Sequence, residues 1–369
     1  MAIIIFIAVI SLLVYLDNLR LFFKGLRNRK DVHNFEKKTV SVVVAARNEE
    51  KNISHLLTSL TNQSYPQALY EIIIADDESE DKTIEIIEGF IKNNDNIRLL
   101  HSENRENVKS PKKNALSTGI AQAKGEIIMT TDADCIVGKY WIESYMSCFE
   151  KNVAMVAGLS RTKLRDWTQT SFLNKFENFD FLAMFSAAAG AVSVGKQYSC
   201  SGQNLAYTKA AFNEIGGFSL IENMVSGDDI FLMQLFKRND KEIIFNFSPH
   251  NFVYTKPVTN TKSLINQRSR WASDVKWVGS FNPEFLIYLI STFIVTLLPI
   301  YVAVVRPYFG IPILIIRILF EYPLLKFSFN LFGEDKSKLK FYPYWFLVQP
   351  LYMIVVTVKG LFESFIWKK

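Results

Sequence analysis

The two ends of the chain constrain the fold most, because both are apolar enough to cross a lipid bilayer. Residues 1–23 contain only two charged side chains, Asp17 and Arg20. Three more apolar stretches lie near the other end, at 283–305, 308–329 and 342–358. A membrane-spanning helix needs about 20 apolar residues. The sequence therefore predicts an N-terminal transmembrane helix at 1–23 and a C-terminal membrane region at 283–369 with about three apolar segments.

Basic residues at the C-terminal end of the first segment and just after it predict its orientation. They are Arg20, Lys24, Arg27, Arg29 and Lys30. Short flanks rich in Lys and Arg stay in the cytoplasm, so we expect an inner-membrane protein whose next domain faces the cytoplasm. The segment lacks a basic start and a small-residue cleavage site, which favours an uncleaved anchor over a cleaved signal peptide. The last apolar stretch has lysines on both sides, so it either crosses the bilayer or lies in the interface or re-enters.

Charge and cysteine content exclude some partners. The net charge of +6 has no nucleic-acid-like stripe, and basic residues beside anionic lipid account for it. We therefore expect a lipid bilayer and no nucleic acid as a partner. The three cysteines, Cys135, Cys148 and Cys200, show no CxxC spacing. This favours a reduced cytoplasmic domain without a disulfide framework or zinc site.

Residues 37–260 have the composition of a soluble domain and alternate between strand-like and helix-like blocks. The strand-like blocks are VSVVVAA, YEIIIAD, NIRLL and EIIMTT. The helix-like blocks between them are NISHLLTSLTNQ, KTIEIIEGFIKN and SPKKNALSTGIAQAKG. Such alternation predicts an α/β domain with a mostly parallel sheet, in which ligands bind beyond the carboxyl ends of the strands.

Carboxylates follow two of these strands, Asp76 and Asp77 after the second and Asp132 and Asp134 after the fourth. An extended chain would point Asp132 and Asp134 to one face, where two hard oxygen ligands suit Mg2+ or Mn2+. A solvated turn is the alternative for either motif alone. The chain contains neither GxGxxG nor GxxxxGK[ST], so a bound nucleotide would need a metal to carry much of its phosphate charge.

A third acidic cluster lies in SGDDIFLMQLF, residues 226–236. Gly227 permits a tight turn before Asp228 and Asp229, and a helical pattern follows them. Adjacent carboxylates can hold different pKa values, so that one acts as a general base. A helix N-cap is the alternative on the local pattern.

Six segments together resemble a membrane-bound family 2 glycosyltransferase with a GT-A fold, similar to the branch of ceramide glucosyltransferase, cellulose synthase and hyaluronan synthase. They occur in the family's order between about Val40 and Trp271: VSVVVAARNEEKNISHLLTSLTNQSYP, YEIIIADDESEDKT, KKNALSTGIAQAKGEIIMTTDAD, SCSGQNLAYTKAAFNEIGGF, SGDDI and QRSRW. The resemblance implies inverting transfer from a nucleotide-diphosphate sugar, usually a UDP-sugar, to a lipid or glycan acceptor, with Mn2+ or Mg2+ as cofactor.

The resemblance also implies roles for residues. Asp229 would be the catalytic base, with Asp228 beside it. The donor would contact Asp76, Asp77, Lys112 or Lys113, Asp132, Arg268 and Arg270. The metal would bind Asp134 and Asp132, and the acceptor would contact Gly202, Gln203, Asn204 and Trp271. Two positions depart from the family: Phe231 stands where many members have an acid, and Gln203 replaces a smaller residue. Both departures bear on acceptor identity more than on the reaction.

QRSRW lies in residues 261–281, where apolar residues recur at helical spacing among basic ones. That pattern predicts an amphipathic helix at the membrane interface, and anchoring alone would explain it. With the upstream motifs present, we expect this helix also to complete the active site, since arginine binds phosphate and tryptophan suits a sugar ring. A processive polysaccharide synthase and a catalytically silent transporter or scaffold are the alternative functions.

Overall fold

The computed structural model describes residues 1–29, 36–102, 109–164, 166–224 and 226–362. The chain forms two compact units. The first, the helical unit, contains Met1–Arg29, Leu164–Tyr198 and Pro257–Lys369, and the second, the sheet unit, contains Lys30–Lys163 and Ser199–Lys256. Each is described by itself.

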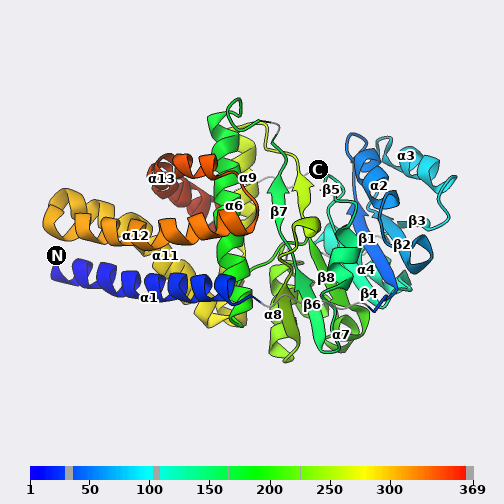
Figure 1. Ribbon diagram of the computed structural model, residues 1–369, viewed down its shortest axis with the longest axis horizontal. Helices are drawn as coiled ribbons and strands as arrows, with labels where there is room; N and C mark the ends of the chain where they lie inside the picture. The colour runs from blue at the N-terminus through cyan, green and yellow to red at the C-terminus, as the bar shows by residue number, and fades with distance from the viewer. Residues whose placement is uncertain (30–35, 103–108, 165, 225, 363–369) are drawn as a thin grey trace. The chain divides into compact units, whose positions relative to one another are not determined.

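A seven-stranded sheet forms the centre of the sheet unit (Figure 1). Its strands, in spatial order, are β3 (Ile97–His101), β2 (Tyr70–Asp76), β1 (Val40–Ala46), β4 (Ile127–Thr130), β8 (Leu205–Thr208), β6 (Val153–Ala157) and β9 (Glu242–Phe245). β8 is antiparallel to both neighbours, and the other neighbouring strands are parallel. The predicted mostly parallel α/β fold is therefore confirmed.

The strand β1 is apolar except for Ser41, because helices cover both faces of the sheet. Val42 and Val44 share a buried cluster with α2 (Ile53–Thr61) and with Ile87 of α3 (Thr83–Ile91). On the other face α4 (Pro111–Gln122) packs on β1 and β2. A Cβ on Gly119 would lie 2.5 Å from the Val43 side chain, so this glycine lets α4 approach the sheet.

The rest of the sheet unit supports this core. A three-stranded sheet has the order β5 (Ile136–Val137), β10 (Val253–Thr255) and β7 (Ser160–Thr162). The remaining helices of the unit are α5 (Trp141–Met146), α7 (Lys209–Glu214) and α8 (Ile230–Arg238), and the 3-10 turns are η1 (Gln67–Leu69), η2 (Ser219–Ile221) and η3 (Pro249–Asn251).

Seven helices and one 3-10 turn form the described part of the helical unit: α1 (Ala2–Arg27), α6 (Phe172–Ser193), α9 (Thr261–Ser273), α10 (Val275–Phe281), α11 (Pro283–Val305), α12 (Pro307–Leu331), η4 (Lys336–Phe341) and α13 (Tyr342–Leu361). α1 packs against α6, α11 and α12, and α13 packs against α9 (Figure 1). By length and composition, α1, α11, α12 and the segment Lys336–Leu361 can each cross a membrane. These four apolar helices indicate membrane association.

The domain expected at 37–260 includes segments of both compact units. Leu164–Tyr198, which contains α6, groups with the apolar helices. Glycines explain its close packing on α1, because a Cβ on Gly25 would lie 2.2 Å from the Gly190 carbonyl oxygen, and one on Gly190 would lie 2.6 Å from that of Phe22. Small residues let helix backbones meet in this way.

Two local features of the helical unit add detail to the expected segments. Residues 261–281 form two helices, since α9 ends at Ser273 and α10 begins at Val275. The last apolar stretch is not broken by its prolines. Pro343 lies in the first turn of α13, where its missing N–H costs nothing, and the helix continues through Pro350 to Leu361.

Candidate active site

The turn after β4 brings two predicted metal ligands together. β4 ends at Thr130, and the Cys135 N–H donates to the Asp132 carbonyl oxygen over 3.0 Å. The extended arrangement expected for Asp132 and Asp134 is therefore wrong. The turn has the same effect, because ligand atoms of Asp132, Asp134 and Cys135 all lie within 4.8 Å of one another.

The chemistry of these three residues fits a hard divalent cation. Asp132 and Asp134 are partly exposed, and carboxylate oxygens suit Mg2+ and Mn2+. Cys135 is 1% exposed. Burial, with the charges of Asp132 and Asp134, raises the pKa of the Cys135 thiol well above its usual value. Hard cations prefer oxygen ligands to thiols, so we assign the metal role to the two carboxylates and treat Cys135 as a packing residue.

The two neighbouring lysines of α4 have different environments. Lys112 Nζ lies 2.9 Å from Asp132 Oδ1 and 2.9 Å from Asp228 Oδ2. Burial lowers the pKa of Lys112, but the two carboxylates outweigh it and raise that pKa. Lys113 is 2% exposed and donates to the carbonyl oxygens of Ile221, at 2.6 Å, and Ser226, at 3.2 Å. Lys112 therefore joins the candidate site, whereas Lys113 fixes the chain before Gly227.

Asp229 lies where the tight turn enters α8. Gly227 has a φ of +80°, as the turn prediction requires. Asp229 is the N-cap of α8, and its Oδ1 accepts the Ile230 N–H at 2.6 Å. Its Oδ2 accepts the Gly202 N–H at 2.8 Å. Because each carboxylate oxygen has two lone pairs, capping leaves acceptor capacity for a proton.

The charge environment of Asp229 favours a proton acceptor. Burial, and next the charge of Asp228, raise the pKa of Asp229 above its ordinary value, while Lys112 and the two backbone N–H groups oppose that rise. A base is most effective when its pKa approaches the working pH. Both readings of Asp229, N-cap and base, are compatible with this arrangement.

The loop of Gly202, Gln203 and Asn204 borders the same carboxylates. The Gly202 carbonyl oxygen accepts the Thr130 hydroxyl at 3.1 Å. A Cβ at Gly202 would lie 3.0 Å from Asp228 Oδ2 and 3.5 Å from Lys112 Nζ. Gln203 is partly buried, and its Oε1 makes no hydrogen bond within the described residues.

Asn204 is directed into the protein interior. Its side chain is 0% exposed. Its Oδ1 accepts from Trp141 Nε1 and Tyr145 Oη, and its Nδ2 donates to the carbonyl oxygens of Leu159 and Asn251, all within 2.7–2.8 Å. Through these bonds Asn204 fixes the loop of residues 202–204. No local pattern reveals Trp141, Tyr145 or Asn251 as its partners, because they lie far away in sequence.

The first acidic pair lies at the end of β2. Asp76 is 1% exposed, and its Oδ2 accepts the Ser79 N–H at 3.1 Å. Asp77 Oδ2 lies 3.3 Å from Arg47 Nη1, and its Oδ1 accepts the Ser102 hydroxyl at 3.1 Å. Arg47, at the end of β1, was not predicted as a site residue, although it follows a buried strand at the same sheet edge.

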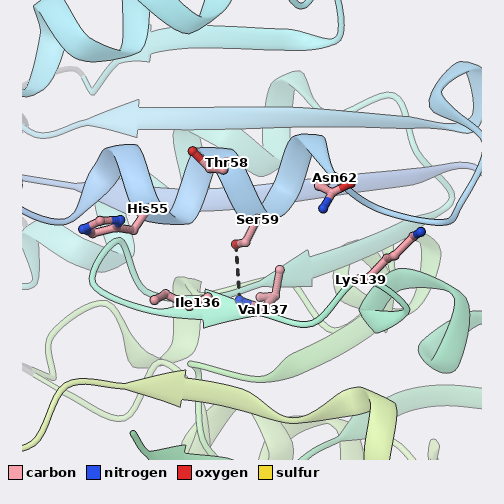
Figure 2. Close-up of a pocket in the computed structure, with 7 residues that line it drawn as sticks. All are labelled: His55, Thr58, Ser59, Asn62, Ile136, Val137 and Lys139. Atoms are coloured by element: carbon pink, nitrogen blue, oxygen red, sulfur yellow. Dashed lines mark hydrogen bonds between the residues drawn. The ribbon is translucent and has the colours of Figure 1, made fainter. Parts of the chain in front are cut away.

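A separate pocket of about 270 Å³ lies between α2 and β5. Figure 2 shows His55 and Lys139 at its two ends and the hydrogen bond from the Val137 N–H to Ser59 Oγ, which is 3.3 Å long. The other lining residues are Thr58, Asn62 and Ile136. It contains none of the clustered carboxylates, so we do not assign it to the candidate active site.

QRSRW lies on α9 in the helical unit. Arg268 is 4% exposed, and its Nε lies 3.8 Å from Asp180 Oδ2. Its guanidinium carbon lies 4.1 Å from the centre of the Trp271 ring. Arg270 is partly buried. The two arginines of the motif thus differ in exposure.

Comparisons with known proteins bear on the family and the fold of this chain. The model of glycosyl transferase family 2 matches residues 41–259, more than half of the chain. The poly-beta-1,6-N-acetyl-D-glucosamine synthase of Staphylococcus epidermidis is 28% identical over 304 residues, which cover 79% of this chain and 69% of that protein. The beta-monoglucosyldiacylglycerol synthase of Trichormus variabilis is 28% identical over 238 residues, 63% of this chain and 48% of that protein.

Among solved structures, the mannosyltransferase PcManGT from Pyrobaculum calidifontis, in complex with GDP-Man and Mn2+, has a TM-score of 0.64. It is 18% identical, and the match covers 98% of this chain and 99% of that one. At this identity the similarity shows the fold.

Proposed function

We propose, since the chain belongs to glycosyl transferase family 2, that it moves a sugar with inversion from a nucleotide-diphosphate sugar to a hydroxyl of a membrane lipid or glycan. That the chain is a glycosyltransferase follows from its family. The donor, the metal, the acceptor and the residue roles are the proposal. A UDP-sugar is the donor class that we favour.

One observation carries the proposal: Lys112 joins the metal motif to the base motif. Its ammonium contacts the carboxylates of Asp132 and Asp228. Asp229, next to Asp228 in the chain, accepts the Gly202 N–H. Four sequence motifs that are separated by up to 116 positions along the chain, from Lys112 to Asp228, thus meet at one point. A positive charge among carboxylates at strand ends suits a diphosphate and the cation that accompanies it.

Asp134 and Asp132 would hold the divalent metal, and Asp76 and Asp77 would contact the nucleoside. The metal would neutralise the charge that develops on the leaving diphosphate. Lys112 would exchange one of its carboxylate partners for a phosphate oxygen. We assign Lys113 and Asn204 to fixing the site's loops, because their polar atoms are used inside the sheet unit.

Asp229 would act as the base. The acceptor oxygen forms a bond to the anomeric carbon while the bond from that carbon to the diphosphate oxygen breaks. The acceptor's proton passes to the Asp229 carboxylate, and the nucleoside diphosphate leaves. Attack opposite the leaving group inverts the anomeric carbon. Asp228 keeps the pKa of Asp229 raised, which makes it a stronger base.

The family resemblance implies roles for QRSRW as well. In this proposal Arg270, the more exposed of the two arginines, balances the diphosphate charge. Trp271 contacts the acceptor, as do Gly202 and Gln203. Four apolar helices and the basic residues at the C-terminal end of α1 support a protein of the inner membrane whose sheet unit faces the cytoplasm.

The test is diphosphate release by the purified protein in detergent. Nucleotide sugars are screened with Mn2+, Mg2+ or EDTA, and wild type is compared with Asp229→Asn. We expect metal-dependent release that the substitution lowers about 10²- to 10⁴-fold, the contribution of general base catalysis. Asp240→Asn, at the exposed far end of α8, is the matched control. Equal activity of Asp229→Asn and wild type would overturn the assignment of the base.

A processive synthase is the second candidate, since the Staphylococcus epidermidis relative is named as a polysaccharide synthase. The glucosyldiacylglycerol synthase relative favours a single addition to a lipid. Product length on membrane lipid extract separates the two. Products that carry one sugar contradict processivity, and a ladder of lengths contradicts single addition.

A further inference from the structure

Helix α6 carries buried polar side chains that the proposed site does not use. Glu177, Asn178 and Asp180 are 4%, 2% and 5% exposed. Both carboxylates are expensive to bury without partners. Glu177 accepts the Val258 N–H at 3.0 Å, which accounts for its burial locally. Asp180 instead faces two other helices of the same unit.

Asp180 is bound from α13 and faces α9. Trp345 Nε1 donates to its Oδ1 at 3.2 Å, and the Tyr352 hydroxyl donates to its Oδ2 at 3.3 Å. Its charged partner is Arg268, whose Nε lies 3.8 Å from Oδ2. The carboxylate is therefore held by two neutral donors and balanced by one guanidinium.

Arg268 in turn lies against Trp271. The two residues are three positions apart on α9, so their side chains share a helix face. The guanidinium carbon lies 4.1 Å from the Trp271 ring centre and 5.2 Å from that of Phe181. The Trp271 and Phe181 rings are stacked, with centres 6.0 Å apart and planes at 24°.

Asp180 is the close charged partner of Arg268. Within the described residues, Nε and Nη1 of Arg268 are buried and make no hydrogen bond. The guanidinium is held by the Asp180 charge and the aromatic rings, with the Glu177 charge and the Tyr352 hydroxyl as further partners. Removal of the Asp180 charge weakens this hold and lets the buried cation move away from Trp271.

We propose that Asp180 is a positioning residue that orients Trp271 through Arg268 for contact with the acceptor. The inference rests on the proposed function, in which Trp271 contacts the acceptor. The two arginines of QRSRW then have different roles. Arg268 supports Trp271, and Arg270 binds the donor diphosphate.

The first test observes Trp271 without any substrate. The full-length protein in detergent is labelled with 5-fluorotryptophan, and its six tryptophans are followed by 19F NMR. Trp271→Phe assigns the resonance. Asp180→Asn, which keeps the shape of the side chain, should shift or broaden the Trp271 signal. Asp17→Asn, at the exposed Asp17–Arg20 pair of α1, is the control and should leave that signal in place.

Non-additivity separates positioning from general damage. Arg268→Met should move the Trp271 signal, and Asp180→Asn added to Arg268→Met should move it no further. Arg268→Lys is a milder variant, since it keeps the charge and loses the planar stacking group, and it should move the signal in the same direction. An unchanged Trp271 signal in Asp180→Asn, or additive shifts in the double variant, would overturn the proposal.

The second test measures where the donated sugar goes. With membrane lipid extract as the probe acceptor, Asp180→Asn should lower the ratio of lipid-linked sugar to free sugar about tenfold, because a small misplacement near the chemistry costs up to about 100-fold. The KM for the donor should not change. A rise in the donor KM as large as the loss of transfer would contradict a role on the acceptor side. If wild type releases no sugar from any donor, the proposed function fails, while the 19F result still decides the positioning.

Discussion

Each of the two compact units contains a charged cluster, and the two clusters differ in how completely their charges are enclosed. In the sheet unit, the side chains of Lys112 and Asp132 are each 29% exposed and that of Asp228 is 10% exposed. In the helical unit, Arg317 and Glu321 of α12 are 1% and 5% exposed. The first cluster, of Lys112, Asp132 and Asp228, is open enough to exchange a partner for a ligand. The second cluster, of Arg317 and Glu321, is closed.

The closed cluster joins three membrane helices. Arg317 Nη2 lies 3.2 Å from Glu321 Oε1 and 2.5 Å from Gln349 Oε1 of α13. Glu321 also accepts the hydroxyls of Tyr15, from α1, at 2.5 Å and of Tyr342, from α13, at 2.8 Å. Charged groups in membrane helices are costly and need such partners. The contrast supports the proposal that the first cluster serves chemistry, whereas the second joins helices.

The largest expected effect concerns the closed cluster. Glu321→Gln should destabilise the protein by about 3–5 kcal/mol, because it leaves the Arg317 charge buried without its partner. The measurement is denaturant unfolding in micelles. Asp17→Asn is the control, since the Asp17–Arg20 pair is 56% and 65% exposed and such pairs contribute about 0–1 kcal/mol. Similar losses for both variants would remove the distinction between closed and open clusters.

The two lysines of α4 provide the next test. Lys112→Met should raise the KM for the donor about 10- to 100-fold, as expected for loss of one or two charge-assisted hydrogen bonds, with little change in unfolding temperature. Lys113→Met should instead lower the unfolding temperature, because it removes the bonds to Ile221 and Ser226. Steady-state kinetics and thermal unfolding are measured on both. The reverse pattern would exchange the roles of the two lysines.

Crowding of the open cluster should have a smaller effect. Gly202→Ala places a methyl group 3.0 Å from Asp228 Oδ2, which should lower turnover about tenfold, in line with about 1–3 kcal/mol for overpacking. Gly89→Ala is the matched control. Its Cβ meets nothing within 4 Å inside α3, so stability should rise by about 0.5–1 kcal/mol. Full activity of Gly202→Ala would show that the cluster tolerates displacement.

The smallest effect is a shift in the pH profile. A base must be deprotonated, so kcat/KM should fall as the pH drops through the raised pKa of Asp229. Burial and Asp228 raise that pKa. Asp228→Asn removes the like charge, so the acid limb of kcat/KM should move to lower pH. A shift to higher pH would contradict the influence of Asp228 on Asp229.

Local sequence patterns determined much of this protein. Runs of apolar residues predicted the membrane helices, and the alternation of strand and helix patterns predicted the sheet, because both depend on residues that are neighbours in the chain. Acidic residues after strands marked the site, since the ends of parallel strands share one edge. Gly227 marked its turn, as only glycine adopts that backbone conformation freely.

Tertiary structure decided which of these residues meet. Nothing local distinguishes Lys112 from Lys113, yet the direction of each side chain on α4 sends one to Asp132 and the other to the Ser226 carbonyl oxygen. The partner of Arg268 could not be predicted either, because Asp180 lies 88 positions earlier on another helix. Packing between distant segments sets such pairs, and a single sequence contains no local signal of that packing.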